Sequence, residues 1–190
     1  MARWEPNARE RLASSALDLF AERGYEGTTA AEIAARAGLA KSTFFRHFAD
    51  KREVLFAGQD LIGEAFAAAM RACPPSATPR ELLHAALAAA AFAFGDERRA
   101  WVVRRQAVID DNTELREREL LKRASLTAAL ESALRERGLG ERLAALAAEV
   151  GSLAFRGAFA RWIAPSNARG YAELAREELD ALASAAASLG

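Results

Sequence analysis

The sequence predicts an all-α protein, and three observations point to that fold class. Alanine, the strongest helix former, supplies 48 of the 190 residues. Apolar residues recur at spacings of three and four, and most of these stretches begin at a Thr or Asp cap or end at Gly or Pro. No run of alternating apolar and polar residues is bounded by turn signals, so no sheet is expected. We therefore expect nine helices joined by short connections.

The first four expected helices are separated by local end signals. Gly24 suits the left-handed backbone that ends a helix. Thr29 and Glu32 form a capping box, in which each side chain can bond the other residue's backbone N–H. A three-residue turn around Gly38 leads to the third helix, and Asp50 caps a long fourth one.

The remaining five helices are delimited in the same way. Two adjacent prolines break the chain, and Thr78 with Glu81 then forms a second capping box. Asp96 caps the sixth helix, Gly138 ends the seventh and Pro165 ends the eighth. The expected helices span about residues 7–23, 29–36, 40–47, 51–72, 79–94, 97–110, 113–137, 141–163 and 171–190.

The composition excludes several classes of protein. Hydrophobic residues make up 52% of the chain and 26 basic residues balance 26 acidic ones, which excludes a disordered protein. One cysteine, Cys73, excludes a disulfide scaffold and a structural zinc site, and we expect no metal or cofactor. The N-terminus lacks an apolar segment of signal-peptide length, and the longest uncharged run is shorter than the roughly 18 residues of a membrane span. We therefore expect a cytoplasmic protein that does not enter membranes.

The balanced total charge hides a basic segment. Residues 36–52 contain five basic side chains and one acid, and the segments before and after are mildly acidic. Two short helices joined by a tight turn form a helix-turn-helix, and the positive charge is concentrated on the second helix and its borders. Its short donors and long cations suit base edges and phosphates. The alternative is a solvated basic helix of an ordinary bundle.

The stretch LDLFAERGYEGTTAAEIAARAGLAKSTFFRHFADKREVL resembles the DNA-binding domain of TetR-family (TetR/AcrR type) transcriptional regulators. The GY, the paired threonines, IA, AG, the aromatic pair, HF and the following lysine recur at the family's spacing. The resemblance implies a homodimer with a DNA-binding domain at residues 1–50 and a ligand-binding and dimerisation domain at 51–190. By position it implies DNA contacts from Thr28, Thr29, Arg36, Lys41, Ser42, Thr43, Phe45, Arg46, His47 and Lys51.

Three residues depart from the family pattern. Ala40 replaces the usual serine cap, which weakens the start of the third helix by about 1 kcal/mol. Ser42 stands where glycine is frequent, and Phe45 replaces a frequent tyrosine, so its ring can offer only apolar contact. These differences leave the operator sequence open.

Large side chains among many alanines can frame a cavity between the helices of the second domain. We expect the pocket there, although each of these residues can also be ordinary core. An arginine of the sixth helix could pair with a phosphate or carboxylate, as in an acyl-CoA; a solvated basic face is the alternative. The expected pocket residues are Phe66, Met70, Phe92, Trp101, Arg105, Phe155 and Phe159.

Small and apolar residues on the last two helices predict a dimer interface, or else complete the core of one protomer. A dimer would read two half-sites about one helical turn apart. The expected interface residues are Gly151, Ala154, Ala158, Leu174, Leu179 and Leu182.

The leading interpretation is a DNA-binding repressor that leaves a palindromic operator when a small, largely apolar or acyl-CoA-like effector binds. An activator and an effector-independent DNA-binding protein are the alternatives. We do not expect an enzyme, because no catalytic residues, Gly-rich phosphate loop or metal-ligand set can be identified.

Overall fold

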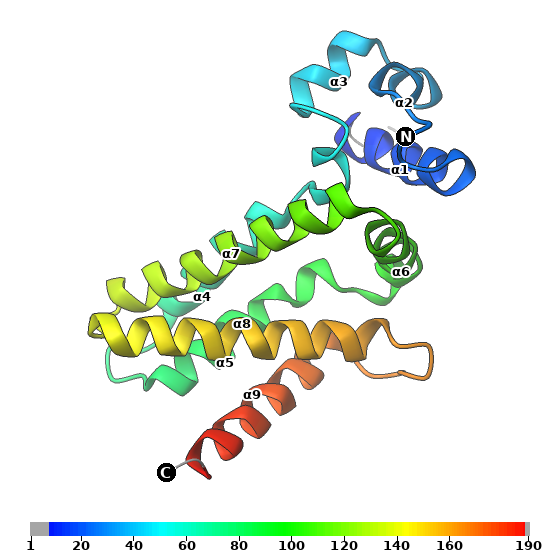
Figure 1. Cartoon of the computed structure of the whole chain (residues 1–190). Helices are drawn as coiled ribbons and strands as arrows, with labels where there is room; N and C mark the ends of the chain where they lie inside the picture. The colour runs from blue at the N-terminus through cyan, green and yellow to red at the C-terminus, as the bar shows by residue number, and fades with distance from the viewer. Residues whose placement is uncertain (1–7, 189–190) are drawn as a thin grey trace, which may run out of the picture. The chain divides into compact units, whose positions relative to one another are not determined.

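The structure is a computed structural model that describes residues 8–188, and in that part of the chain every regular element is helical (Figure 1). The predicted all-α class with nine α-helices is therefore confirmed for these residues. Asn7, where the first helix was expected to begin, lies outside them. The elements are α1 (Ala8–Arg23), α2 (Ala30–Arg36), α3 (Lys41–His47), η1 (Glu53–Phe56), α4 (Gln59–Ala72), α5 (Pro79–Ala89), η2 (Ala90–Ala93), α6 (Asp96–Asp110), α7 (Thr113–Glu136), α8 (Glu141–Ile163) and α9 (Tyr171–Ala187).

The chain divides into two compact units. Unit 1 extends to residue 58 and also contains residues 103–120, and unit 2 contains residues 59–102 and 121–190. Unit 1 thus runs past the boundary expected at residue 50 and takes in the end of α6 and the start of α7.

Unit 1 is organised around α1, α2 and α3, which lie together in Figure 1. The capping box of α2 is present, since the Thr29 hydroxyl accepts from the Glu32 N–H and the Glu32 carboxylate accepts from the Thr29 N–H. Gly24 has a φ of 77°, as its position after α1 requires. Apolar residues from each helix, among them Leu17, Ile33 and Phe44, are fully buried between them.

The expectation of one continuous fourth helix over residues 51–72 is wrong. A short 3₁₀ turn, η1, precedes the regular helix α4, and Gly58 between them has a φ of 86°. This left-handed backbone interrupts the helical hydrogen bonds, and glycine is the residue that adopts it with least strain. The three residues Val54, Leu55 and Phe56 are buried in unit 1, which explains why the apolar pattern continued through the break.

Unit 2 is built around α5, which contacts α4, α8 and α9. Close approach depends on small residues: a Cβ added at Gly151 of α8 would lie 2.8 Å from Leu83 Cδ2 of α5. By length and composition α8 could cross a membrane, and it is the one helix within residues 8–188 that meets this criterion. Ala148, Ala154 and Trp162 of α8 are buried inside unit 2, as expected for a core helix.

The C-terminal end of α4 is held by an arginine from the end of α7. Arg137 donates to the carbonyl oxygens of Met70 at 3.0 Å, Cys73 at 2.8 Å and Pro74 at 2.5 Å. These carbonyls lie where the regular bonding of α4 ends, and two of them also accept a backbone N–H, Met70 O from Cys73 and Pro74 O from Ala77. Arg137 therefore closes the helix end that the sequence leaves without a capping glycine.

We expect Arg137→Ala to lower the free energy of unfolding by about 1–3 kcal/mol, because it removes several hydrogen bonds to partly buried carbonyls. Urea denaturation followed by circular dichroism measures the change. Arg135→Ala is the matched control: Arg135 is exposed and pairs with Glu131 at 3.9 Å, so its loss should cost less than about 0.5 kcal/mol. Equal effects of the two substitutions would contradict the role of Arg137.

Candidate nucleic-acid interface and ligand cavity

The exposed face of α3 carries four of the residues expected to meet DNA. Lys41, Ser42, Phe45 and Arg46 are exposed, and they share one side of the helix because their spacings are one, four and five. Phe44 is buried against the other helices and holds α3 in place. Ala40 makes no side-chain cap bond, as its replacement of a serine predicts.

Phe45 and Lys41 form the apolar and cationic parts of this face. The Phe45 ring is 50% exposed, which is unusual for a large apolar side chain, and Lys41 Nζ lies 5.9 Å from its centre. An exposed ring of this kind can contact a thymine methyl in the major groove.

Two other arginines of the basic segment are neutralised by carboxylates. Arg36 makes two hydrogen bonds to Glu22 of α1, at 2.7 and 3.0 Å, and the pKa of the Glu22 carboxyl is lowered by this guanidinium. Arg52 pairs with Asp50 at 2.7 Å. Within residues 8–188, by contrast, no carboxylate pairs with Lys41 or Arg46. Among the exposed cations of the segment, those without a carboxylate partner in the described residues therefore lie on α3.

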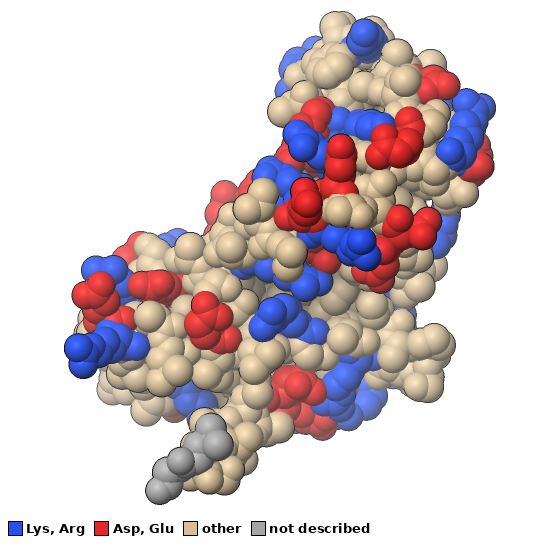
Figure 2. Space-filling model, viewed as in Figure 1, with Lys and Arg blue, Asp and Glu red and all other residues tan. Residues whose placement is uncertain are grey.

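The surface view agrees with this pairing. Figure 2 shows basic and acidic side chains next to each other over much of the visible face of unit 1. A broad field of one sign does not cover that face, so recognition of phosphates depends on which cations lack a nearby acid.

Lys51 has an internal role in the structure. Its ammonium donates to the carbonyl oxygens of Tyr25 at 2.9 Å and Thr28 at 3.2 Å, and it lies 4.1 Å from the centre of the Tyr25 ring. The Tyr25 hydroxyl in turn donates to Glu114 at 3.1 Å. Lys51 thus fixes the turn that precedes α2, and a phosphate contact could use only its remaining N–H.

The two threonines before α2 have different surroundings. Thr29 is exposed at the start of α2, but its backbone N–H donates to the Glu32 carboxylate at 2.9 Å, so a phosphate contact there must use the Thr29 hydroxyl or displace Glu32. Thr28 is 1% exposed and its hydroxyl donates to Gly24 O at 3.0 Å, so the expected DNA contact by the Thr28 side chain is wrong. Thr43 and His47 are half-buried at the border of the α3 face, and His47 Nε2 is buried without a hydrogen-bond partner in the described part of the chain.

The aromatic residues expected to frame a pocket instead fill the core of unit 2. Phe155 contacts Phe66 with ring centres 5.9 Å apart, and Phe94 contacts Phe155 and Phe159 at 5.8 and 5.7 Å. The crevice beside Phe66 and Phe155 encloses about 10 Å³, roughly the space of one water molecule. Most of the expected pocket residues are therefore packing residues: Phe66 and Met70 are buried, Trp101, Phe155 and Phe159 lie partly buried against the core, and Phe92 is 53% exposed.

Arg105, the arginine expected among the pocket residues, belongs to the other unit. Arg105 is 6% exposed, its Nε donates to Leu55 O at 2.5 Å, and its guanidinium lies 5.0 Å from the centre of the Phe56 ring, all within unit 1. Its assignment to the ligand pocket is therefore wrong.

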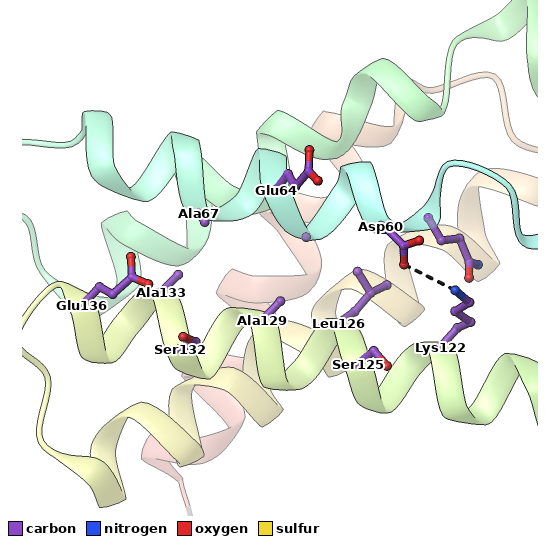
Figure 3. Close-up of a pocket in the computed structure, with 12 residues that line it drawn as sticks. Asp60, Glu64, Ala67, Lys122, Ser125, Leu126, Ala129, Ser132, Ala133 and Glu136 are labelled. Atoms are coloured by element: carbon purple, nitrogen blue, oxygen red, sulfur yellow. Dashed lines mark hydrogen bonds and ion pairs between the residues drawn. The ribbon is translucent and has the colours of Figure 1, made fainter.

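Unit 2 has a groove between α4 and α7 with a volume of about 340 Å³ (Figure 3). Its middle is formed by small residues, including Gly63, Ala67 and Ala129, and its ends carry charged side chains. A Cβ added at Gly63 would lie 3.3 Å from Ala129 Cβ, so small residues are needed where the helices cross. The lining residues are Gln59, Asp60, Gly63, Glu64, Ala67, Lys122, Ser125, Leu126, Ala129, Ser132, Ala133 and Glu136.

The residues expected at the dimer interface face the interior of the protomer. Ala154 and Ala158 are fully buried, and Leu174 and Leu179 are 1% and 2% exposed. Gly151 is buried against Leu83, and Leu182 lies partly buried against the same core. Their burial favours the alternative, that they complete the core of one protomer. The exposed face of α8 instead carries Leu146 and Leu153, which are 63% and 45% exposed.

Sequence reasoning missed Glu22, Tyr25 and the α4–α7 groove. Glu22 and Tyr25 lie far along the chain from Arg36 and Lys51, so their pairing has no local signal. The groove does have one, because Gly63 and Ala67 repeat at a spacing of four on α4. Within residues 8–188, no group of three or more His, Cys, Asp or Glu side chains is arranged to hold a metal ion.

Known proteins that resemble this chain are transcriptional regulators. The family model described as "Bacterial regulatory proteins, tetR family" matches residues 12–57. The regulator TcmR of Streptomyces glaucescens is 41% identical over 81 residues, which cover 43% of this chain and 36% of TcmR. The chain thus matches about a third of the length of that curated relative.

Solved structures of regulators cover almost the whole chain. FadR of Thermus thermophilus, described as a TetR family transcriptional repressor in complex with lauroyl-CoA, is 26% identical with a TM-score of 0.51 over 92% of this chain and 93% of that one. FadR of Bacillus subtilis is 21% identical with a TM-score of 0.57 over 91% of this chain and 96% of that one, and this similarity concerns the fold alone.

Proposed function

We propose that this chain, which by its N-terminal domain is a member of the tetR family of bacterial regulatory proteins, is a repressor that binds a palindromic operator as a homodimer. Lys41, Ser42, Thr43, Phe45 and Arg46 of α3 would enter the major groove. Thr29 and His47, with the remaining N–H of Lys51, would contact phosphates beside it. Arg36 would lie at the border, where Glu22 already balances its charge.

One observation carries this proposal: the exposed face of α3 holds Lys41 and Arg46, the two exposed cations of the basic segment that no described carboxylate compensates. Binding to DNA releases counterions in proportion to the phosphates that cations neutralise. Cations without an acid partner, on a helix that can enter the major groove, release counterions from the phosphates and can also contact base edges.

Footprinting of the full-length protein on the DNA upstream of its own gene tests the proposal. We expect protection of an inverted repeat with half-sites about 34–36 Å apart or a multiple of that spacing. Binding that shows no sequence preference over a random duplex at the same salt concentration would contradict an operator-specific regulator.

We propose that unit 2 receives a small, largely apolar effector that releases the operator. The lauroyl-CoA complex of the T. thermophilus regulator supports an effector with an apolar chain. Arg105, one of the arginines of α6 and the one expected in the pocket, is engaged within unit 1, so the proposal concerns the apolar chain alone. Operator release in the presence of an effector distinguishes this function from an effector-independent DNA-binding protein, and a reporter gene distinguishes repression from activation.

We propose that two copies of the chain pair through the exposed face of α8. Leu146, Leu153 and Ala160 are exposed at a spacing of seven residues, which places them on one side of the helix. Glu149 and Arg156, also exposed, lie beside them with the same spacing. A two-fold axis near Leu153 sets Glu149 of one protomer opposite Arg156 of its partner, and the reverse.

The location that fits a regulator of this kind is the cytoplasm, where it meets chromosomal DNA.

A further inference from the structure

We infer that the groove between α4 and α7 binds an elongated organic cation, with an ammonium group at its Asp60 end and an apolar body along its middle. The inference rests on the proposed function in one respect only, namely that an effector binds unit 2. It adds the charge of that effector and the place where it binds.

The size and lining of the groove suit a small molecule. Its volume of about 340 Å³ falls within the range of ligand pockets. From Lys122 to Glu136 the groove follows about 20 Å of α7, at the rise of an α-helix. Ala67, Ala129 and Ala133 line the middle, so an alkyl or aryl body can lie against α4 and α7 there.

The polar groups of the groove are mainly acceptors. Figure 3 shows Asp60 and Lys122 pointing toward each other at one end, with Glu136 at the other end. Three carboxylates face a single ammonium, that of Lys122, which lies 3.4 Å from Asp60. Lys122 balances one of the three carboxylates, so the lining keeps an excess of negative charge.

Two further acceptors lie at the same end. Gln59 Oε1 is buried and has no hydrogen-bond partner among the described residues. Ser125 Oγ uses its hydrogen on Leu121 O at 3.1 Å, so it can only accept from a ligand. A buried acceptor without a donor is costly, and a ligand N–H would satisfy it.

Glu64 strengthens the preference for a cation. It lies one helical turn from Asp60 on α4 and, within residues 8–188, no ion pair engages it. Glu136 is paired only with exposed Arg71, at 3.6 Å. A phosphate or carboxylate in this groove would meet three carboxylates and one ammonium, that of Lys122, whereas a ligand ammonium between Asp60 and Glu64 would meet two carboxylates for that one ammonium.

Isothermal titration of the full-length protein with three ligands of equal chain length tests this inference. The ligands are decylammonium, decan-1-ol and decanoate, each below its micelle-forming concentration at pH 7. We expect decylammonium to bind at least tenfold more tightly than decanoate, with decan-1-ol between them. Equal or tighter binding of decanoate would overturn the inference and favour an anionic, acyl-type effector.

Substitutions of two exposed lining residues, Glu64 and Ser132, test whether the ligand binds in the groove. Glu64→Gln should weaken decylammonium binding about fivefold and leave decan-1-ol unchanged, since it removes charge but not volume. Ser132→Trp should abolish binding of both by filling the groove. Glu117→Gln, which changes an exposed glutamate of α7 outside the groove, is the control and should bind like the original protein.

Unchanged decylammonium affinity in both Glu64→Gln and Ser132→Trp would show that the cation binds elsewhere and would overturn the assignment. The titration contains no DNA, so its failure leaves the proposed DNA binding intact. Failure of footprinting would leave the titration result intact in the same way.

Discussion

Replacing Lys41 and Arg46 together by alanine is expected to weaken operator binding by about 100-fold or more, since each contact to a base or phosphate is worth about 1–3 kcal/mol. Both side chains are exposed on α3 and neither has a carboxylate partner in the described part of the chain. Their loss should therefore leave the fold unchanged, which a thermal melt verifies. Fluorescence anisotropy with a labelled operator, measured over a range of salt concentrations, gives the affinity.

The matched control removes the same number of charges from the same segment. Arg36→Ala with Arg52→Ala should weaken binding less than about fivefold, because Glu22 and Asp50 already neutralise these guanidiniums. The salt dependence separates two kinds of contact: each lost phosphate contact lowers the slope by about one, whereas a lost base contact leaves it unchanged. A larger loss from the Arg36 and Arg52 pair than from Lys41 and Arg46 would contradict the proposed interface.

The parts of the fold that could be predicted from the sequence are those with local causes. The capping box at Thr29 and Glu32 spans three residues, and the structure contains it as expected. Gly58 is also a local signal, since an isolated glycine weakens a helical pattern. The apolar residues on both sides of it nevertheless keep the spacing of one continuous helix. The exposed face of α3 was predictable because the large apolar residues Phe44 and Phe48, four residues apart, mark the side that faces the core, and both are buried.

The ligand cavity and the packing of α8 have causes that only the tertiary structure contains. An aromatic ring among alanines can border a cavity or fill the space itself. In unit 2, Phe94 fills the space by contacting Phe155, Phe159 and Trp162. Small residues on α8 predict a close helix contact without naming the partner, and for Gly151 the partner is Leu83 of the same chain. The groove escaped prediction because its lining is small and polar, and such residues carry little hydrophobic signal.

Leu153→Arg is expected to raise the dissociation constant of the dimer by about two orders of magnitude. The proposed two-fold axis passes near Leu153, so the substitution removes apolar contact from both copies and brings two like charges together, which costs several kcal/mol. Sedimentation equilibrium measures the change. Operator affinity should fall with it, because a single helix-turn-helix then reads each half-site alone.

Leu61→Arg is the matched control, since Leu61 of α4 is 49% exposed against 45% for Leu153 and lies on another helix. It should leave the dimer intact. The charges beside Leu153 allow a stricter test: Glu149→Arg alone should weaken the dimer, and Glu149→Arg with Arg156→Glu should restore it, because the exchange keeps opposite charges facing each other across the axis. A double variant as weak as the single one would exclude this register. A dimer that survives both Leu153→Arg and Glu149→Arg would exclude the α8 face altogether.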